Sequence, residues 1–148
     1  MHAGTPDLEG QPAPDFALRS LGAANLRLSE YLGQVVMLNF WATWCGPCRQ
    51  EMPLLDELYN KYRRAGFVLL SINVDDAGER ATEMVETLKV TYPVLLDERK
   101  AVSRAYEVAN MPVTVLIDRE GVVRFVSEGY RPGYEQRYAD ALRELLNE

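Results

Sequence analysis

The stretch VVMLNFWATWCGPC, residues 35–48, joins an apolar run to a Cys-x-x-Cys pair. Its first seven residues are apolar except for Asn39, which is typical of a central strand covered on both faces. Downstream of the cysteines an apolar stripe recurs at helical spacing, formed by Leu54, Leu55, Leu58 and Tyr62. The pair is therefore predicted to lie where a buried strand gives way to a helix.

Cys45 and Cys48 are the only cysteines among the 148 residues, and this narrows their chemistry. A structural zinc site needs four ligands and an iron–sulfur cluster usually four cysteines, whereas the only histidine is His2. A purely structural bridge is disfavoured, because closing so short a loop removes little entropy from the unfolded chain. Dithiol–disulfide exchange is the predicted chemistry, and neither a metal nor an organic cofactor is expected.

The two thiols are predicted to differ in reactivity. Cys45 lies at the expected helix N-terminus, where unpaired N–H groups and the helix dipole favour a thiolate. Such settings lower a cysteine pKa from about 8.5 to roughly 3.5–7.5, so Cys45 is the predicted nucleophile. Cys48, one turn into the helix, is predicted to be less exposed and to resolve the mixed disulfide. Trp44 is expected to offer an apolar contact to substrate, and Pro47 to restrain the start of the helix.

The chain resembles the thioredoxin superfamily, and within it the extracytoplasmic TlpA/ResA-type branch rather than thioredoxin itself. The motif LNFWATWCGPC, residues 38–48, carries the superfamily resemblance. Four further stretches are similar to the opening segment, first helix, inserted strand and helix, and cis-proline loop with its following strand in that branch, at residues 11–16, 49–53, 94–108 and 111–118. The resemblance spans nearly all of residues 11–147.

The predicted architecture is one α/β domain, residues 11–148, preceded by a flexible segment of residues 1–10. Strand and helix patterns alternate along the chain, which implies a parallel core, and the turn at Gly121 adds an antiparallel pair. The expected last helix has one apolar face, formed by Tyr134, Tyr138, Ala141, Leu142 and Leu145. The resemblance implies a thioredoxin fold: a mixed central sheet flanked by helices, with an N-terminal hairpin (strands at 16–20 and 25–28) and an inserted strand (92–96) and helix.

The resemblance also implies a substrate groove beside the cysteines. An X-Pro bond is cis in only about 5–6% of cases in folded proteins, but the matching proline of this superfamily is cis. Pro112 is therefore expected to be cis and to face the Cys-x-x-Cys pair, which leaves the backbone of Met111 free to pair with an extended substrate. Thr114 is expected to fill the fold. Gly129 resembles the glycine that lets substrate approach, and an ordinary turn glycine is the alternative.

Asn39 stands where thioredoxins carry a buried acid, and an amide cannot accept the proton of the resolving thiol at neutral pH. Glu51 is predicted to compensate, because it follows Cys48 by three residues and so lies on the same helical face. A nearby carboxylate raises the pKa of the thiol and could relay its proton, and a matching Glu is characteristic of ResA-like proteins. The alternative is that Glu51 faces water and only complements the helix dipole.

Composition and charge restrict the partners. The length suits one soluble domain, and a net charge of −6 argues against nonspecific binding to nucleic acids or anionic membranes. No stretch approaches the ~20 apolar residues of a membrane span, and the N-terminus lacks the features of a signal peptide. Either the protein is cytosolic or an exporting or anchoring segment is missing from this sequence. The resemblance favours an extracytoplasmic location, and a monomer is expected.

The predicted function is reduction of protein disulfides, with re-reduction by a membrane thiol carrier. The family inference extends to cytochrome c maturation, with apocytochrome c as the substrate. A general cytosolic-type thioredoxin is one alternative. A thiol peroxidase is another, but its cysteine follows a Thr or Ser by three residues, and Ala42 holds that place before Cys45. A noncatalytic binding module is the weakest alternative, because such modules usually lose one or both cysteines.

Overall fold

A computed structural model describes residues 8–22 and 24–148 of the chain. Within them, one mixed seven-stranded sheet has the order β2-β1-β5-β4-β3-β6-β7. The strands are β1 (Ala17–Ser20), β2 (Asn25–Arg27), β3 (Val35–Trp41), β4 (Phe67–Asn73), β5 (Val94–Leu96), β6 (Val113–Ile117) and β7 (Val123–Glu128). The helices are α1 (Gly46–Tyr62), α2 (Glu79–Leu88), α3 (Ala101–Ala105) and α4 (Tyr134–Leu146), with 3-10 turns at Leu28–Tyr31 and Arg63–Ala65.

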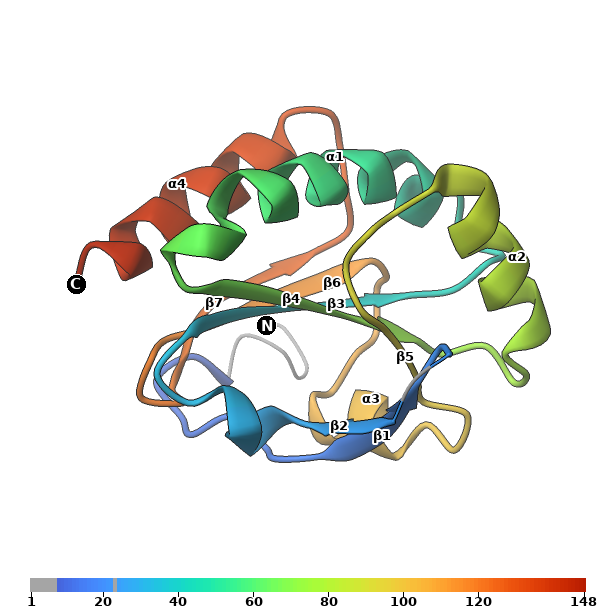
Figure 1. Cartoon of the computed structure of the whole chain (residues 1–148), viewed down its shortest axis with the longest axis horizontal. Helices are drawn as coiled ribbons and strands as arrows, with labels where there is room; N and C mark the ends of the chain where they lie inside the picture. The colour runs from blue at the N-terminus through green and yellow to red at the C-terminus, as the bar shows by residue number, and fades with distance from the viewer. Residues whose placement is uncertain (1–7, 23) are drawn as a thin grey trace.

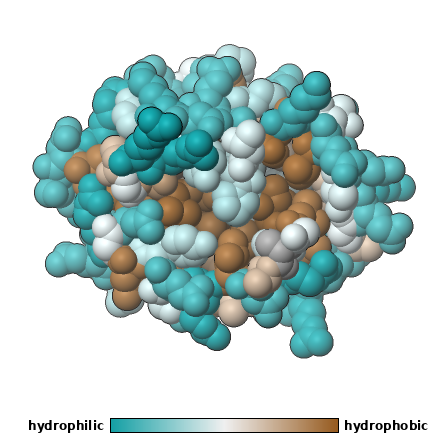
Figure 2. Space-filling model, in the orientation of Figure 1, coloured by the Kyte–Doolittle hydropathy of each residue, from teal (hydrophilic) through white to brown (hydrophobic). Residues whose placement is uncertain are grey.

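Strand β3 is the centre of the sheet and of the core. It pairs parallel with β4 and antiparallel with β6, and all seven of its residues are buried. Helices α1 and α4 lie side by side over one face of the sheet, whereas α3 lies on the other side (Figure 1). On the face shown in Figure 2, apolar side chains form a band across the middle of the molecule, between hydrophilic surfaces above and below. The predicted two-sided burial of this strand is confirmed.

The predicted N-terminal hairpin and inserted strand are also confirmed, and they form one unit. β1 and β2 are antiparallel, and β5 pairs parallel with β4 on one side and antiparallel with β1 on the other. The inserted strand therefore joins the hairpin to the main sheet. It begins at Val94 rather than at the expected Tyr92, because Pro93 has no N–H to contribute to a ladder.

The N-terminal end of the described chain lies against strand β7. The first seven residues of the expected flexible segment lie outside the described residues. Of the rest, Leu8 is buried, and the Gly10 N–H donates to the Val123 carbonyl at 2.7 Å. Over the described part of the chain, no helix has both the length and the apolar character needed to cross a membrane.

Three polar side chains lie in a row at the centre of the sheet. Asn39 of β3 is the register partner of Ser71 in β4 and of Thr114 in β6, and all three are fully buried. Buried polar groups are costly unless they find hydrogen-bond partners. Among the described residues, Asn39 bonds to Thr114 and to Glu51 of α1, whereas Ser71 Oγ finds no partner.

Candidate active site

The two cysteines form a disulfide at the start of α1, with their Cα atoms 5.3 Å apart. Cys45 is the N-cap residue in extended conformation, and its Sγ accepts a hydrogen bond from the Cys48 N–H at 3.3 Å. Cys45 is 7% exposed and Cys48 is 0% exposed. The predicted placement at the helix N-terminus and the predicted order of exposure are confirmed, and solvent reaches the site on the side of Cys45.

The residues around the pair divide into surface and core as predicted. Trp44 is 71% exposed, whereas Trp41 is fully buried. Pro47 occupies the second helical position, where its missing N–H removes no intrahelical hydrogen bond. The active-site loop therefore presents one large aromatic surface to solvent directly before the disulfide.

The loop before β6 lies at the same edge of the sheet as the cysteines. Phe40 is the register partner of Val113, so the residues after β3 and those before β6 are neighbours. The Met111–Pro112 bond is cis, as the resemblance implied. Neither the N–H nor the C=O of Met111 bonds to the backbone of another described residue. This segment therefore keeps a free edge beside the active-site loop.

Gly129, which follows β7, is hydrogen-bonded to the loop before β6. Its N–H donates to the carbonyls of Pro112 at 2.8 Å and Asn110 at 3.2 Å. Its φ is +76°, so the turn itself accounts for a glycine, and a Cβ built there would meet nothing within 4 Å. The position is thus both a turn that needs glycine and an open surface.

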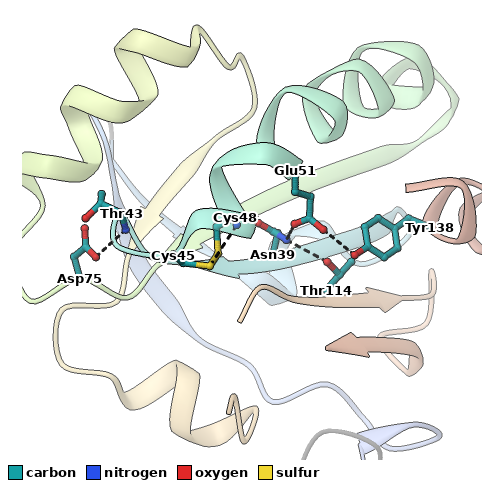
Figure 3. Close-up of a disulfide and its surroundings, with 8 residues drawn as sticks. All are labelled: Asn39, Thr43, Cys45, Cys48, Glu51, Asp75, Thr114 and Tyr138. Atoms are coloured by element: carbon teal, nitrogen blue, oxygen red, sulfur yellow. Dashed lines mark hydrogen bonds between the residues drawn. A yellow bond between two sulfur atoms is a disulfide. The ribbon is translucent and has the colours of Figure 1, made fainter. Parts of the chain in front are cut away.

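Glu51 is held in a buried hydrogen-bond network beside the disulfide (Figure 3). Its Oε1 accepts from the Asn39 Nδ2 at 2.8 Å, and its Oε2 accepts from the Tyr138 hydroxyl at 2.7 Å. Asn39 Nδ2 also donates to Thr114 Oγ1 at 3.1 Å. Glu51 is 0% exposed, which contradicts the alternative that this carboxyl faces water.

Burial sets the protonation of this carboxyl group. Removal from water disfavours the charged form and raises the pKa of Glu51 to about 7, while the hydrogen bonds from Tyr138 and Asn39 act in the opposite direction. A carboxyl group with a pKa near neutrality can both take up and release a proton under physiological conditions. The arrangement therefore has the acid–base capacity that Asn39 lacks.

Sequence reasoning missed Tyr138 and Thr114 as members of the site. Tyr138 was assigned to the apolar face of the last helix and Thr114 to the filling of the fold, and both are indeed fully buried. The signal that could have found them is the placement of Glu51 on the same helical face as Cys48, which was predicted to be less exposed. A carboxylate that is buried on that face requires donors. A tyrosine on the packed face of a helix is one of few side chains that supply such a donor within a core.

A second polar anchor lies on the other side of the disulfide (Figure 3). Asp75, which is buried, accepts from the Thr43 N–H at 3.1 Å and thereby fixes the loop just before Trp44. Its own N–H donates to Asn73 Oδ1. Over residues 8–22 and 24–148, no cluster of three or more His, Cys, Asp or Glu side chains could hold a metal ion.

Comparison with known sequences identifies close relatives. The sequence profile of the AhpC/TSA family matches residues 9–126. The thiol-disulfide oxidoreductase ResA of Geobacillus kaustophilus is 41% identical over 120 residues, which cover 81% of this chain and 69% of the relative. The thioredoxin-like protein YneN of Bacillus subtilis is 38% identical over 125 residues, which cover 82% of this chain and 72% of the relative.

Comparison with solved structures agrees. The crystal structure of a proposed thiol:disulfide interchange protein DsbE from Chlorobium tepidum has a TM-score of 0.90 at 35% identity, covering 93% of this chain and 97% of that one. The thioredoxin domain of a thiol-disulfide oxidoreductase from Bacteroides vulgatus has a TM-score of 0.81 at 25% identity, covering 94% and 98%. The predicted thioredoxin fold is confirmed. The chain therefore belongs to the AhpC/TSA family, and with its disulfide-bonded Cys45–Cys48 pair it is a ResA-like thiol-disulfide oxidoreductase.

Proposed function

We propose that this enzyme reduces disulfides of extracytoplasmic proteins, with Cys45 as nucleophile and Cys48 as resolving thiol. The observation that carries the proposal is the asymmetry of the pair: the Cys45 sulfur lies at the solvent side on a helix N-terminus, and Cys48 lies fully buried behind it. A thiolate at Cys45 is stabilised by the Cys48 N–H and by the helix dipole.

The reaction takes place in two displacements. The Cys45 thiolate attacks one sulfur of the substrate disulfide, which forms a mixed disulfide and releases the first substrate thiolate. Cys48 then loses its proton and attacks the Cys45 sulfur, which forms the Cys45–Cys48 bond and releases the second substrate thiolate. Two electrons pass from the enzyme to the substrate, and a membrane thiol carrier restores the dithiol by the same chemistry in reverse.

Glu51 is the base for the second displacement in this proposal. It follows Cys48 by three residues in α1, so the two Cβ atoms are about 5–6 Å apart. Its near-neutral pKa allows it to take the proton of the Cys48 thiol and to pass it on to the departing substrate sulfur. Asn39 serves as a donor that holds this carboxyl group.

The substrate is proposed to lie across Trp44, Met111 and Pro112. Trp44 gives an exposed aromatic contact, the unpaired backbone of Met111 gives a strand edge, and the open surface at Gly129 lets the substrate backbone approach. Extended peptides commonly bind by adding main-chain hydrogen bonds at such an edge.

Trp44→Ala tests this contact. Because Trp44 is 71% exposed, the variant should keep its stability within about 0.5 kcal/mol. Its kcat/KM for a protein disulfide should fall about fivefold or more, the loss expected when an aromatic interface contact worth about 1 kcal/mol is removed. Leu32→Ala is the matched control, because Leu32 is 61% exposed but lies before β3, at the opposite end of the strand. Equal rates for both variants would remove Trp44 from the substrate surface.

We propose cytochrome c maturation as the biological role and an apocytochrome c as the substrate. In this proposal the enzyme acts outside the cytoplasm as a monomer. The support is the ResA-type resemblance over nearly the whole chain, together with the identity to proteins of that name. Cys48→Ser tests it, because without the resolving thiol the mixed disulfide on Cys45 cannot be released. Partners captured by this variant in its native host should include an apocytochrome c and a membrane thiol carrier.

Two results would contradict that role. Capture of a broad set of cytosolic proteins without a membrane carrier would indicate a general thioredoxin. Turnover of peroxide without a protein disulfide substrate would indicate a peroxidase. The double variant Cys45→Ser/Cys48→Ser is the control for this capture, because it has no thiol with which to form a mixed disulfide.

A further inference from the structure

We propose that Tyr138 of helix α4 is a positioning residue for the thiol–disulfide reaction: its hydroxyl holds the Glu51 carboxyl group beside Cys48 and stabilises the ionised form of that group. The inference rests on the proposed role of Glu51 as base. It assigns a part in the chemistry to the C-terminal helix, which contributes no cysteine and no proposed substrate contact.

The contact is short and isolated from solvent. The Tyr138 hydroxyl donates to Glu51 Oε2 at 2.7 Å, and both side chains are 0% exposed. The other oxygen, Oε1, is held by Asn39. Each carboxyl oxygen thus has one fixed donor, and the donors come from α4 and β3. Hydrogen bonds from neutral donors to an ionised acceptor are stronger than those between neutral groups, so both contacts favour the carboxylate.

The donor groups of Tyr138 and Asn39 converge on one carboxyl group (Figure 3). Asn39 Nδ2 also donates to Thr114 Oγ1, which ties the network to β6. Elements far apart in the sequence, α4 and β3, therefore hold the two oxygens of Glu51 in place.

Packing fixes the ring of Tyr138 as well as its hydroxyl. Phe125 of β7 contacts it edge to face, with ring centroids 6.1 Å apart and an interplanar angle of 74°. A buried ring in such contact has little freedom to swing its hydroxyl away from Glu51. Tyr138 therefore holds the carboxyl group from a rigid support.

Among the described residues, no positively charged group shifts the pKa of Glu51. Cys48 shares its helix, and Glu135 of α4 raises its pKa further through like charge. Two tyrosines, Tyr92 and Tyr130, also interact with its charge. The groups that offset burial are Tyr138 and Asn39. Loss of the Tyr138 hydroxyl should therefore move the Glu51 titration upward.

The test compares Tyr138→Phe with Tyr106→Phe. Both tyrosines are fully buried, but the Tyr106 hydroxyl donates to the Pro14 carbonyl at 2.6 Å, away from Glu51. In the disulfide form, where no cysteine titrates, the carbon-13 signal of the Glu51 carboxyl reports its ionisation alone. The midpoint should rise by about one pH unit in Tyr138→Phe, a tenfold change in the ionisation constant, and stay in place in Tyr106→Phe. The pH profile of mixed-disulfide release should move upward by the same amount.

An unchanged Glu51 midpoint in Tyr138→Phe overturns the proposal, and so does a release profile that stays in place. Glu51→Gln distinguishes a failure of the Tyr138 contact from a failure of the proposed base role of Glu51. If Glu51→Gln leaves the release profile unchanged while the Glu51 midpoint still responds to Tyr138→Phe, the contact is right and the base role of Glu51 is wrong. Phe125→Leu keeps the test available if Tyr138→Phe does not fold. Phe125 is half-buried and contacts the ring of Tyr138, so loosening this support should raise the midpoint by a smaller amount.

Discussion

Cys45→Ser is expected to lower thiol-dependent reduction of a protein disulfide to the uncatalysed rate. A serine hydroxyl stays protonated where the thiol ionises, and Cys45 carries the sulfur that lies at the helix N-terminus on the solvent side. The fold should be unaffected, because the side chain differs by one atom. The measurement is the initial rate of reduction of an added protein disulfide, with Cys48→Ser as the companion variant. That companion should still form the mixed disulfide once per molecule.

Alkylation of the reduced protein at graded pH independently tests the assignment of Cys45 as the nucleophile. Cys45 should react first with iodoacetamide, with a pKa below the unperturbed value of about 8.5. Preferential alkylation of Cys48 would exchange the roles of nucleophile and resolving thiol. Such a result would also conflict with the complete burial of Cys48.

Glu51→Gln is expected to make the stability of the disulfide form less dependent on pH. The pKa of this carboxyl is about 7 in the folded protein against 4.5 in the unfolded chain, so between these values the folded state binds the additional proton. The stability of the native protein must therefore fall as pH rises from about 4.5 to 7, and it levels off above 7. Across this window the Gln variant should gain about 3 kcal/mol relative to the native sequence.

The measurement is urea unfolding of both oxidised proteins at pH 5 and pH 8. The quantity to compare is the difference in unfolding free energy between the variant and the native protein, taken at each pH. The variant loses hydrogen-bond geometry equally at both pH values, so this loss cancels when the two differences are compared. Glu57→Gln is the matched control, since Glu57 is an exposed carboxylate on the same helix and should follow the native curve. A difference between Glu51→Gln and the native protein that stays constant with pH would mean that the fold does not perturb this group.

The sequence was sufficient for the elements that carry their own signal. Strand β3 was predicted over residues 35–41 and has those bounds, because an apolar run broken only by Asn39 and flanked by Gly33 and the active-site loop leaves little choice of register. The start of α1 at the cysteines was equally clear. The cis bond at Pro112 required the family resemblance, since no local property distinguishes it from a trans bond.

The network around Glu51 could be predicted only in part. Helical spacing placed Glu51 beside Cys48, but it could not distinguish a buried carboxyl from one that faces water. That distinction depends on α4, whose Tyr138 lies 87 residues further along the chain. Periodicity showed which face of α4 packs, not which group of the core its hydroxyl would meet. Contacts of this range are fixed by tertiary packing and leave no local signal in the sequence.

The joining of β3, α1 and α4 in one buried hydrogen-bond network has a consequence for synthesis. A nascent chain holds both cysteines and β3 well before α4 leaves the ribosome, because Tyr138 follows Glu51 by 87 residues. Domains generally fold as units. Until α4 docks, the carboxyl group beside Cys48 lacks one of its two donors. We therefore expect docking of α4, and not formation of the cysteine loop, to complete the surroundings of this carboxyl group.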